Sequence, residues 1–530
     1  MNRFFYLAKA ILLGLCTTQI PATLHVYLSN ADLHRTVTTI RDAGYLAIPN
    51  QRVTPTLTEF GPAFFGGWFF TLSLGAGLSL FSAAYAWLWD RILGRNRALL
   101  ILIGLLWLGA AIAVNSHGFS PIVTTYFLAT PLVVFISALK WMPKQSEKRW
   151  WFHRLALLLP IALLTITWTA HADRLLFLDL RDYLLLSNPV GKKVDDFYYR
   201  YTLYPAEVFK SLEQKTLKTC CVTTVRDKAI ARRMEHALIN DDYLPVAQNA
   251  PVDLEIAQSE NALLFKHEGK TVLQPSIKTF LSRPEDVLRE FSAATDKHAL
   301  FRQVTFASLL VGFPITLYVM VFALLHFLLR FFLGPTPSSV VAGALCLLIG
   351  LALLVPLRLA RVSINDDMQL SEALSATSWQ QRVAALRRLV SQRLDIANFP
   401  AYRRMLASPH VPERYWLAKA LGLSKHREAY EDLLTLLDDP HPNVVSMAFY
   451  ALGQKGERRA IPEILKRIET SDHWYNQWYA YRALRHLGWR QRRPKNALAD
   501  IQPWKGMLLL SPPVGAVFSR FVEKIPVAYD

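Results

Sequence analysis

Long apolar stretches dominate the pattern of hydrophobic and polar positions along this chain. Seven of them are long enough for a helix that crosses a bilayer core, which takes about 20 residues. They lie near residues 7–28, 62–89, 98–115, 121–141, 154–172, 304–330 and 338–357. The second to the fifth are nearly free of charge, so we predict a polytopic α-helical membrane protein. The first resembles a signal peptide, but no clean small-x-small site follows it, which favours an uncleaved anchor.

Two polar intervals separate groups of these stretches. In the shorter one, residues 29–61, we predict a helix from Asp32 to Ala43. The longer one, residues 173–303, has the pattern of a small α/β domain, with strands and helices in the order β-α-β-β-α. Before the first strand, Asn188–Asp196 is predicted to break a helix. The aromatic run that follows, Phe197–Tyr204, fits either an interfacial belt or a docking edge for a partner.

A degenerate repeat occupies the C-terminal third of the chain. Asp439-Pro440-His441 leads to Ala451-Leu452-Gly453, and Ser408-Pro409-His410 leads in the same way to Ala420-Leu421-Gly422. Ala420, Ala451 and Ala483 stand 31 and 32 residues apart. A period of this length is typical of stacked helical hairpins. The two glycines are predicted to end their helices in left-handed turns.

The repeat unit starts with Asp/Ser-Pro and continues as Val-x-x-x-Ala-x-x-Ala-Leu-Gly. In this it resembles HEAT repeats, particularly the short type also found in phycobilisome lyases. One position departs from that pattern, because the family often has Arg after the Val and this chain has Val445 there. The resemblance implies a curved scaffold, with about four hairpins over residues 366–490, that binds other macromolecules; it implies no particular reaction.

These patterns predict five regions and an orientation. Two loops between spans, Asp90–Arg97 and Lys140–Arg154, are rich in Lys and Arg and should stay cytoplasmic. Provided that the last two apolar stretches are separate spans, both soluble regions then lie outside a bacterial inner membrane. The regions are a membrane region of about five helices at 1–172, an extracytoplasmic α/β domain at 173–303, a two-helix membrane hairpin at 304–357, a HEAT-like α-solenoid at 358–490 and a C-terminal tail at 491–530.

Charge and cysteine content narrow the classes of partner. The formal net charge is +18, but no basic run with interleaved aromatic residues forms a groove for nucleic acid. The positive surplus of the repeats fits a solvated helix face, an acidic partner or anionic lipid headgroups. Four cysteines do not make a disulfide framework, and the adjacent Cys220 and Cys221 would point to opposite faces of a strand.

No catalytic motif is present, since the chain lacks Gly-x-Ser-x-Gly, a Rossmann fingerprint and a Walker motif. Three acidic pairs fit helix capping: Asp195-Asp196, Asp241-Asp242 and Asp366-Asp367. Three histidines near the outer ends of spans could ligate a haem or simply face headgroups: His25, His117 and His171. With no paired histidines at helical spacing and no zinc motif, we expect no cofactor, no metal and no enzymatic activity.

The features together predict a membrane-anchored scaffold or assembly protein whose repeats bind a protein partner in a membrane or envelope complex. Aromatic and Arg residues dominate binding hot spots. The candidate partner-binding residues are Arg459, Glu463, Lys466, Trp474, Trp478 and Arg482. Two other functions stay open: a component of a membrane transport or channel complex, and a membrane redox protein.

Overall fold

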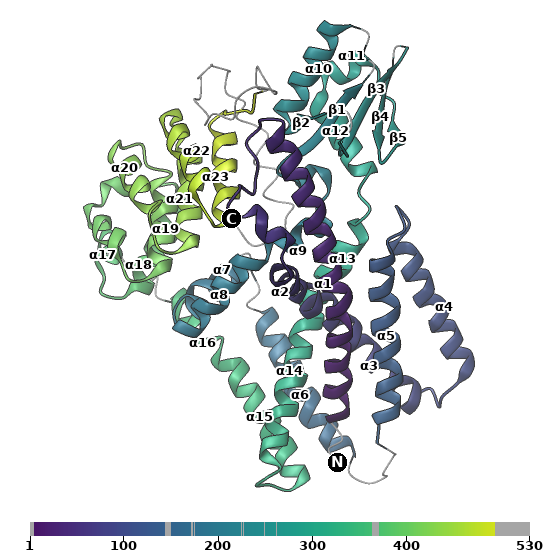
Figure 1. Ribbon diagram of the computed structural model, residues 1–530. Helices are drawn as coiled ribbons and strands as arrows, with labels where there is room; N and C mark the ends of the chain where they lie inside the picture. Colours follow the sequence, from purple (N-terminus) through teal and green to yellow (C-terminus); the bar gives the residue numbers. More distant parts are fainter. Residues whose placement is uncertain are drawn as a thin grey trace.

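The computed structural model describes residues 5–143, 150–170, 173, 175–223, 225, 227–247, 250–260, 262–362 and 370–492. These residues form a helical bundle, a sheet domain and a C-terminal helical array (Figure 1). The sheet domain and the array both lie at one end of the bundle, near the far end of its longest helix (Figure 1). Of the tail predicted at 491–530, only Gln491 and Arg492 belong to the described residues, and Asp366-Asp367 and His171 lie outside them.

Six helical stretches of the described residues are long and apolar enough to cross a membrane. They match six of the seven predicted apolar stretches. The remaining one forms α6, of which the described apolar part is Leu158–Thr169. The helices of the bundle are α1 (Phe5–Asp42), α2 (Phe60–Phe70), α3 (Ala76–Arg91), α4 (Arg97–Val114), α5 (Pro121–Trp141), α6 (Trp150–Thr169), α13 (Ala299–Ala307), α14 (Phe313–Leu329), α15 (Pro335–Ala352) and α16 (Val355–Val362).

Helix α1 lies at the centre of the bundle and packs against several of its helices. Its small residues allow close packing, since a Cβ on Gly14 would lie 2.2 Å from Ser79 Oγ, and Thr18 shares a hydrogen bond of 2.9 Å with Thr130. The residues predicted to be helical from Asp32 are helical, but they form the end of α1, which continues without a break from Phe5 to Asp42. At 38 residues it is about 57 Å long, enough to cross a bilayer core and reach the sheet domain (Figure 1).

The sheet domain has five strands in the order β2-β1-β3-β4-β5, with β1 parallel to β2 and β3 and the other pairs antiparallel. Its own hydrophobic core includes Phe265, Phe280 and Phe291. The predicted β-α-β-β-α order is present, but the sequence missed β2 and α11. Cys220 and Cys221 are free thiols, both buried in β1. The elements are β1 (Lys218–Thr223), α10 (Lys228–Asn240), β2 (Tyr243–Pro245), β3 (Leu254–Ser259), β4 (Ala262–His267), β5 (Lys270–Leu273), α11 (Ile277–Ser282) and α12 (Pro284–Ala294).

Residues 176–209 form a separate segment, which we call the brace. It contains α7 (Leu176–Asp179), α8 (Pro189–Tyr201) and α9 (Leu203–Phe209). The preceding helical stretch does end before Asn188, as predicted, but residues 189–196 belong to a new helix instead of a loop. Asn188 instead begins α8, because its side chain accepts a hydrogen bond from Gly191 N, and proline suits the first position of a helix. The brace belongs to one hydrophobic cluster with the bundle and the array. The sheet domain, which has its own cluster, therefore occupies a shorter stretch of the chain than the predicted 173–303.

The C-terminal array consists of helical hairpins with a shared core. The repeat pattern places Val444, Ala448, Ala451 and Leu452 on one helical stripe of α21, and all four are buried. Ile461, Ile464 and Ile468 of α22 are buried too. Its helices are α17 (Leu370–Ser375), α18 (Trp379–Gln392), α19 (Val411–Leu421), α20 (Glu428–Leu436), α21 (Pro442–Lys455), α22 (Ile461–Thr470) and α23 (Trp474–His486).

Two glycines of the repeat serve helix packing instead of chain reversal. Gly422 has a right-handed φ of -61°, and Gly453 lies inside α21, so the left-handed turns predicted for them are wrong. A Cβ on Gly422 would lie 2.9 Å from Ala451 Cα, and one on Gly453 would lie 3.0 Å from Ala483 Cα. The Ala-Leu-Gly signature is therefore explained by contact between successive repeats, where the glycine of one meets the alanine of the next.

Candidate interaction surfaces of the helical array

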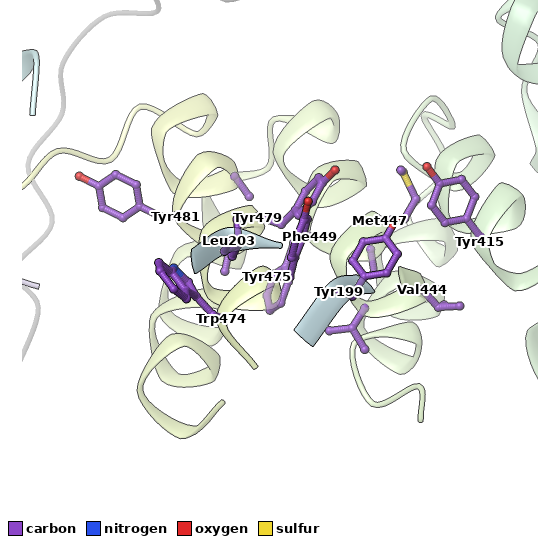
Figure 2. Close-up of a cluster of buried hydrophobic side chains, with 14 of the residues drawn as sticks. Tyr199, Leu203, Tyr415, Val444, Met447, Phe449, Trp474, Tyr475, Tyr479 and Tyr481 are labelled. Carbon is purple, nitrogen blue, oxygen red and sulfur yellow. The ribbon is translucent and has the colours of Figure 1, made fainter. Parts of the chain in front are cut away.

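The array has an inner face that is already covered by the same chain. This face is formed by α18, α19, α21 and α23, and the brace lies across it. Three aromatic pairs join the two, with ring centroids 4.8 to 5.6 Å apart: Tyr199 with Tyr475, Tyr204 with Trp474, and Tyr183 with Trp379. Figure 2 shows Tyr199 and Leu203 of the brace among the buried side chains of the array.

A buried charge cluster fixes the brace to α18 and α19. Arg387 donates to Asp179 at 2.5 Å and to Asp182 at 2.6 Å, and Trp416 Nε1 donates to the same Asp182 oxygen at 2.7 Å. Arg181 also binds Asp182 and stacks over the ring of Tyr415 at 3.8 Å. Both carboxylates are almost inaccessible to solvent. Such a cluster fixes a single geometry, because a buried charge without its partner is strongly unfavourable.

A loop between α1 and α2 holds the other end of the array. Asn50 Nδ2 donates to the backbone oxygens of Ile468 and Ser471, and its backbone N–H donates to Gln477 Oε1 at 2.8 Å. Gln491 in turn exchanges two hydrogen bonds with the backbone of Leu46. The array is therefore attached to the bundle at both of its ends.

The sheet domain meets the array at α23. Tyr481 Oη donates to Asp242 at 2.6 Å, and Arg485 pairs with the same carboxylate and with the backbone oxygen of Asn240. Burial raises the pKa of the neighbouring Asp241 to about 6, although Lys218 acts in the opposite direction. The capping role predicted for this acidic pair is wrong, since both residues follow the C-terminal end of α10.

The outer face of the array, formed by α20 and α22, carries three of the six predicted partner-binding residues. Lys466 is exposed. Arg459 is 41% exposed, stacks over Tyr430 at 3.6 Å and pairs with Glu457. Glu463 accepts from Arg467 at 2.8 Å. These three side chains can be reached by a partner without moving the backbone.

The other three predicted residues lie on α23. Trp474 is buried against Tyr204, so its indole serves the contact with the brace. Trp478 and Arg482 are half-buried, and the guanidinium lies 4.7 Å from the indole ring. Of the six predicted residues, five are thus at least partly accessible to a partner, and Trp474 is buried within the chain.

The brace is the part of this surface that the sequence did not reveal. Its contact residues on α8, Gly191, Asp195 and Tyr199, are spaced four apart and all buried. That spacing is a recognisable signal of one buried helical face. The sequence prediction misses this buried face because it treats Asn188-Pro189 and Gly191 as a helix break.

Of the three histidines considered for haem, His25 and His117 belong to the described residues. His25 is buried among aromatic rings, with His298 at a centroid distance of 6.2 Å. His117 is exposed and shares a hydrogen bond with Ser116.

Comparison with known proteins identifies the array. No curated protein and no solved structure matches the chain. Residues 400–485 match the family of HEAT repeats, which supports a role in protein–protein interaction or scaffolding. This stretch runs from just before α19 to the end of α23, and its alternating helices and glycine contacts are those described above. Residues 400–485 of the array are therefore identified as HEAT repeats.

Proposed function

We propose that this chain is a membrane-anchored scaffold that binds a protein partner through the outer face of its HEAT repeats. The observation that carries the proposal is the occupation of the inner face by the brace. Because the chain itself fills that face, the exposed helices α20 and α22 are the surface left for another protein. Arg459, Glu463 and Lys466 are the residues that we assign to this contact.

The attachment of the array to the bundle supports a scaffolding role. The brace, the Asn50 loop and the sheet domain all hold the repeats in one orientation. A rigid array presents its outer face without the entropic cost of ordering it on binding, and such preorganisation increases affinity.

The location we propose is a bacterial inner membrane, with both soluble regions on the extracytoplasmic side. The Arg-containing loop after α3 contacts the loop after α5, since Arg91 donates to the backbone oxygen of Pro143. The C-terminal ends of α3 and α5 lie at the end of the bundle opposite to the array (Figure 1). Short loops rich in Lys and Arg favour the cytoplasmic side, which supports this orientation.

The test is recovery of co-purifying proteins from native membranes in mild detergent. We expect Arg459→Glu combined with Lys466→Glu to reduce recovery of a stoichiometric partner at least about tenfold. The matched control reverses two exposed charges on α10 of the sheet domain, Lys228→Glu and Arg232→Glu, and should leave recovery unchanged.

A second variant, Trp478→Ala with Arg482→Ala, asks whether the contact extends onto α23. Equal recovery by all variants would contradict the assignment of the outer face. Recovery of this chain alone, with no stoichiometric partner, would contradict the scaffold proposal and favour transport by the bundle.

A further inference from the structure

Three side chains of the types that bind metal ions lie together where the brace crosses the N-terminal end of α21. Asp195 and Asp196 belong to α8, and His441 is the N-cap residue of α21. His441 Nε2 lies 3.9 Å from Asp195 Oδ2 and 3.8 Å from Asp196 Oδ1. One ligand atom from each of the three residues lies within 4.8 Å of the other two. The chain thus brings together three potential ligands, two carboxylates and an imidazole, from positions almost 250 residues apart.

A fourth side chain, Asn443, lies beside this group, and only one end of its amide has a partner. It is 2% exposed, and its Nδ2 donates to Asp195 Oδ2 at 3.0 Å. Its Oδ1 is buried and has no hydrogen-bond partner among the described residues. The same holds for His441 Nε2. Two buried polar atoms without partners at one place are unusual in a native protein and indicate a missing ligand.

Charge at the site points to a cation. Asp195 is 2% exposed, and within the described ranges no Lys or Arg nitrogen lies within 4 Å of its carboxylate. A buried carboxylate is costly unless it is neutralised.

We propose that this cluster binds a divalent transition-metal cation, Zn²⁺ or Mn²⁺, through Asp195, Asp196, His441 Nε2 and the side-chain oxygen of Asn443. Imidazole nitrogen combined with carboxylate oxygen suits these ions, whereas Ca²⁺ and Mg²⁺ prefer oxygen alone. Asp196 is 58% exposed at its side chain, which leaves a path for the ion to enter.

Binding requires two rearrangements. The Asn443 amide must turn so that its oxygen, instead of its Nδ2, faces the group, and His441 must change its tautomer. The backbone N–H of Asn443 faces His441 Nδ1 at 3.4 Å, so without an ion the ring proton belongs on Nε2. Ligation through Nε2 moves that proton to Nδ1 and gives up this long contact. The N-terminal end of α21 is also electropositive, which opposes a cation. Two carboxylates outweigh one weak contact and the partial charge of a helix terminus.

The ion would join α8 to α21 and so hold the brace on the inner face of the array. This role is independent of the partner proposed above, because the outer face contributes no ligand. The metal content would then determine the stability of the contact that attaches the array to the brace and, through it, to the bundle.

The experiment uses the full chain in mild detergent, stripped with EDTA and titrated with ZnCl₂, MnCl₂ and CaCl₂ by calorimetry, with bound metal measured by mass spectrometry. We expect one Zn²⁺ or Mn²⁺ per chain, a higher thermal midpoint when it is bound, and little response to Ca²⁺. His441→Gln and Asp196→Asn should weaken binding at least about tenfold. Asp196 is the cleaner position, since its exposed side chain can be changed without disturbing the core.

The matched control is His410→Gln, at the N-cap of α19 in the preceding repeat, where the ring stacks on Trp379. It should bind the metal as the unchanged chain does. Absence of saturable binding by the unchanged chain would overturn the proposal and mean that a proton neutralises Asp195. Equal binding by Asp196→Asn and His410→Gln would overturn it too, because the metal would then lie elsewhere.

Discussion

The HEAT array and the sheet domain are attached to the same bundle in opposite ways. The buried residues of the array belong to one continuous hydrophobic cluster with the brace and part of the bundle. The sheet domain has a separate cluster around Phe265, Phe280 and Phe291. It touches the array through polar groups, such as the hydrogen bond from Tyr481 to Asp242, and through Leu244 of β2, which belongs to the cluster of the array. The array therefore shares its core with the bundle, and the sheet domain is a unit with its own core docked onto both.

This difference predicts which regions should unfold together and which should unfold alone. A region that buries its apolar surface against another cannot unfold alone, whereas a region with its own core can open as a local unit. We therefore expect substitutions at the brace to loosen array and bundle together. Substitutions in the core of the sheet domain should leave both in place.

The largest effect is expected from Asp182→Asn in the brace. Asp182 accepts from Arg387, Arg181 and Trp416, and the change leaves two buried guanidinium groups with the single carboxylate of Asp179. Removing one partner of a buried ion pair typically costs about 3–5 kcal/mol. The thermal midpoint of the full chain should fall, and protease should cleave both the brace and the array.

The control is Asp438→Asn on the outer side of the array. Asp438 also pairs with an arginine, Arg467, but its side chain is 69% exposed. Exposed pairs contribute less than about 1 kcal/mol, so this variant should behave as the unchanged chain. If both variants lose the same stability, the brace does not hold the array.

A cavity in the sheet domain should give a loss of about 3 kcal/mol that stays within that domain. Phe265→Ala removes a fully buried ring that lies 5.4 Å from Phe280 and 5.8 Å from Phe291, and such changes cost about 3–5 kcal/mol. Hydrogen exchange should accelerate in the strands and in α12 while the array keeps its protection. Faster exchange in α19 and α21 would show that the two cores are coupled.

A smaller effect, dependent on pH, is expected at the junction between the sheet domain and the array. Burial raises the pKa of Asp241 to about 6, compared with about 4 in an unfolded chain. The folded state therefore binds this proton more tightly, and the stability it contributes below about pH 4 is lost as the pH rises to about 6. Two pKa units correspond to about 3 kcal/mol, which partial exposure reduces to about 2.

Asp241→Asn should remove that loss, so the variant should be more stable than the parent at pH 8 and similar to it at pH 4. The thermal midpoint of the full chain at both pH values measures this. Asp227→Asn, at the exposed start of the same helix α10, should change little because asparagine also caps helices. A gain that is equal at both pH values would contradict the assignment to a buried charge.

The sequence predicted what periodicity controls and missed what long-range contacts control. The apolar stretches, the hairpins of the repeats and the stripe that includes Val444 and Leu452 were all found, since each is defined by spacing along the chain. The packing role of Gly422 and Gly453 was not predicted, because each glycine contacts a residue that lies one repeat further along the chain. The brace was missed for the same reason, as Asp182 and Asp195 acquire their meaning only from α18, α19 and α21.

The smallest expected effect tests whether the sheet domain is docked by its hydrogen bonds. Tyr481→Phe removes the bond to Asp242 and should cost about 1 kcal/mol, seen as faster hydrogen exchange near the end of α10 and in β2. Tyr402→Phe is the matched control, because Tyr402 donates to Asp432 at 2.7 Å within the array alone. If both variants lose similar stability and only Tyr481→Phe loosens β2, the domain is a docked unit. If neither change reaches β2, the apolar contacts near α1 position the domain instead, and its independence from the bundle is smaller than the separate cores imply.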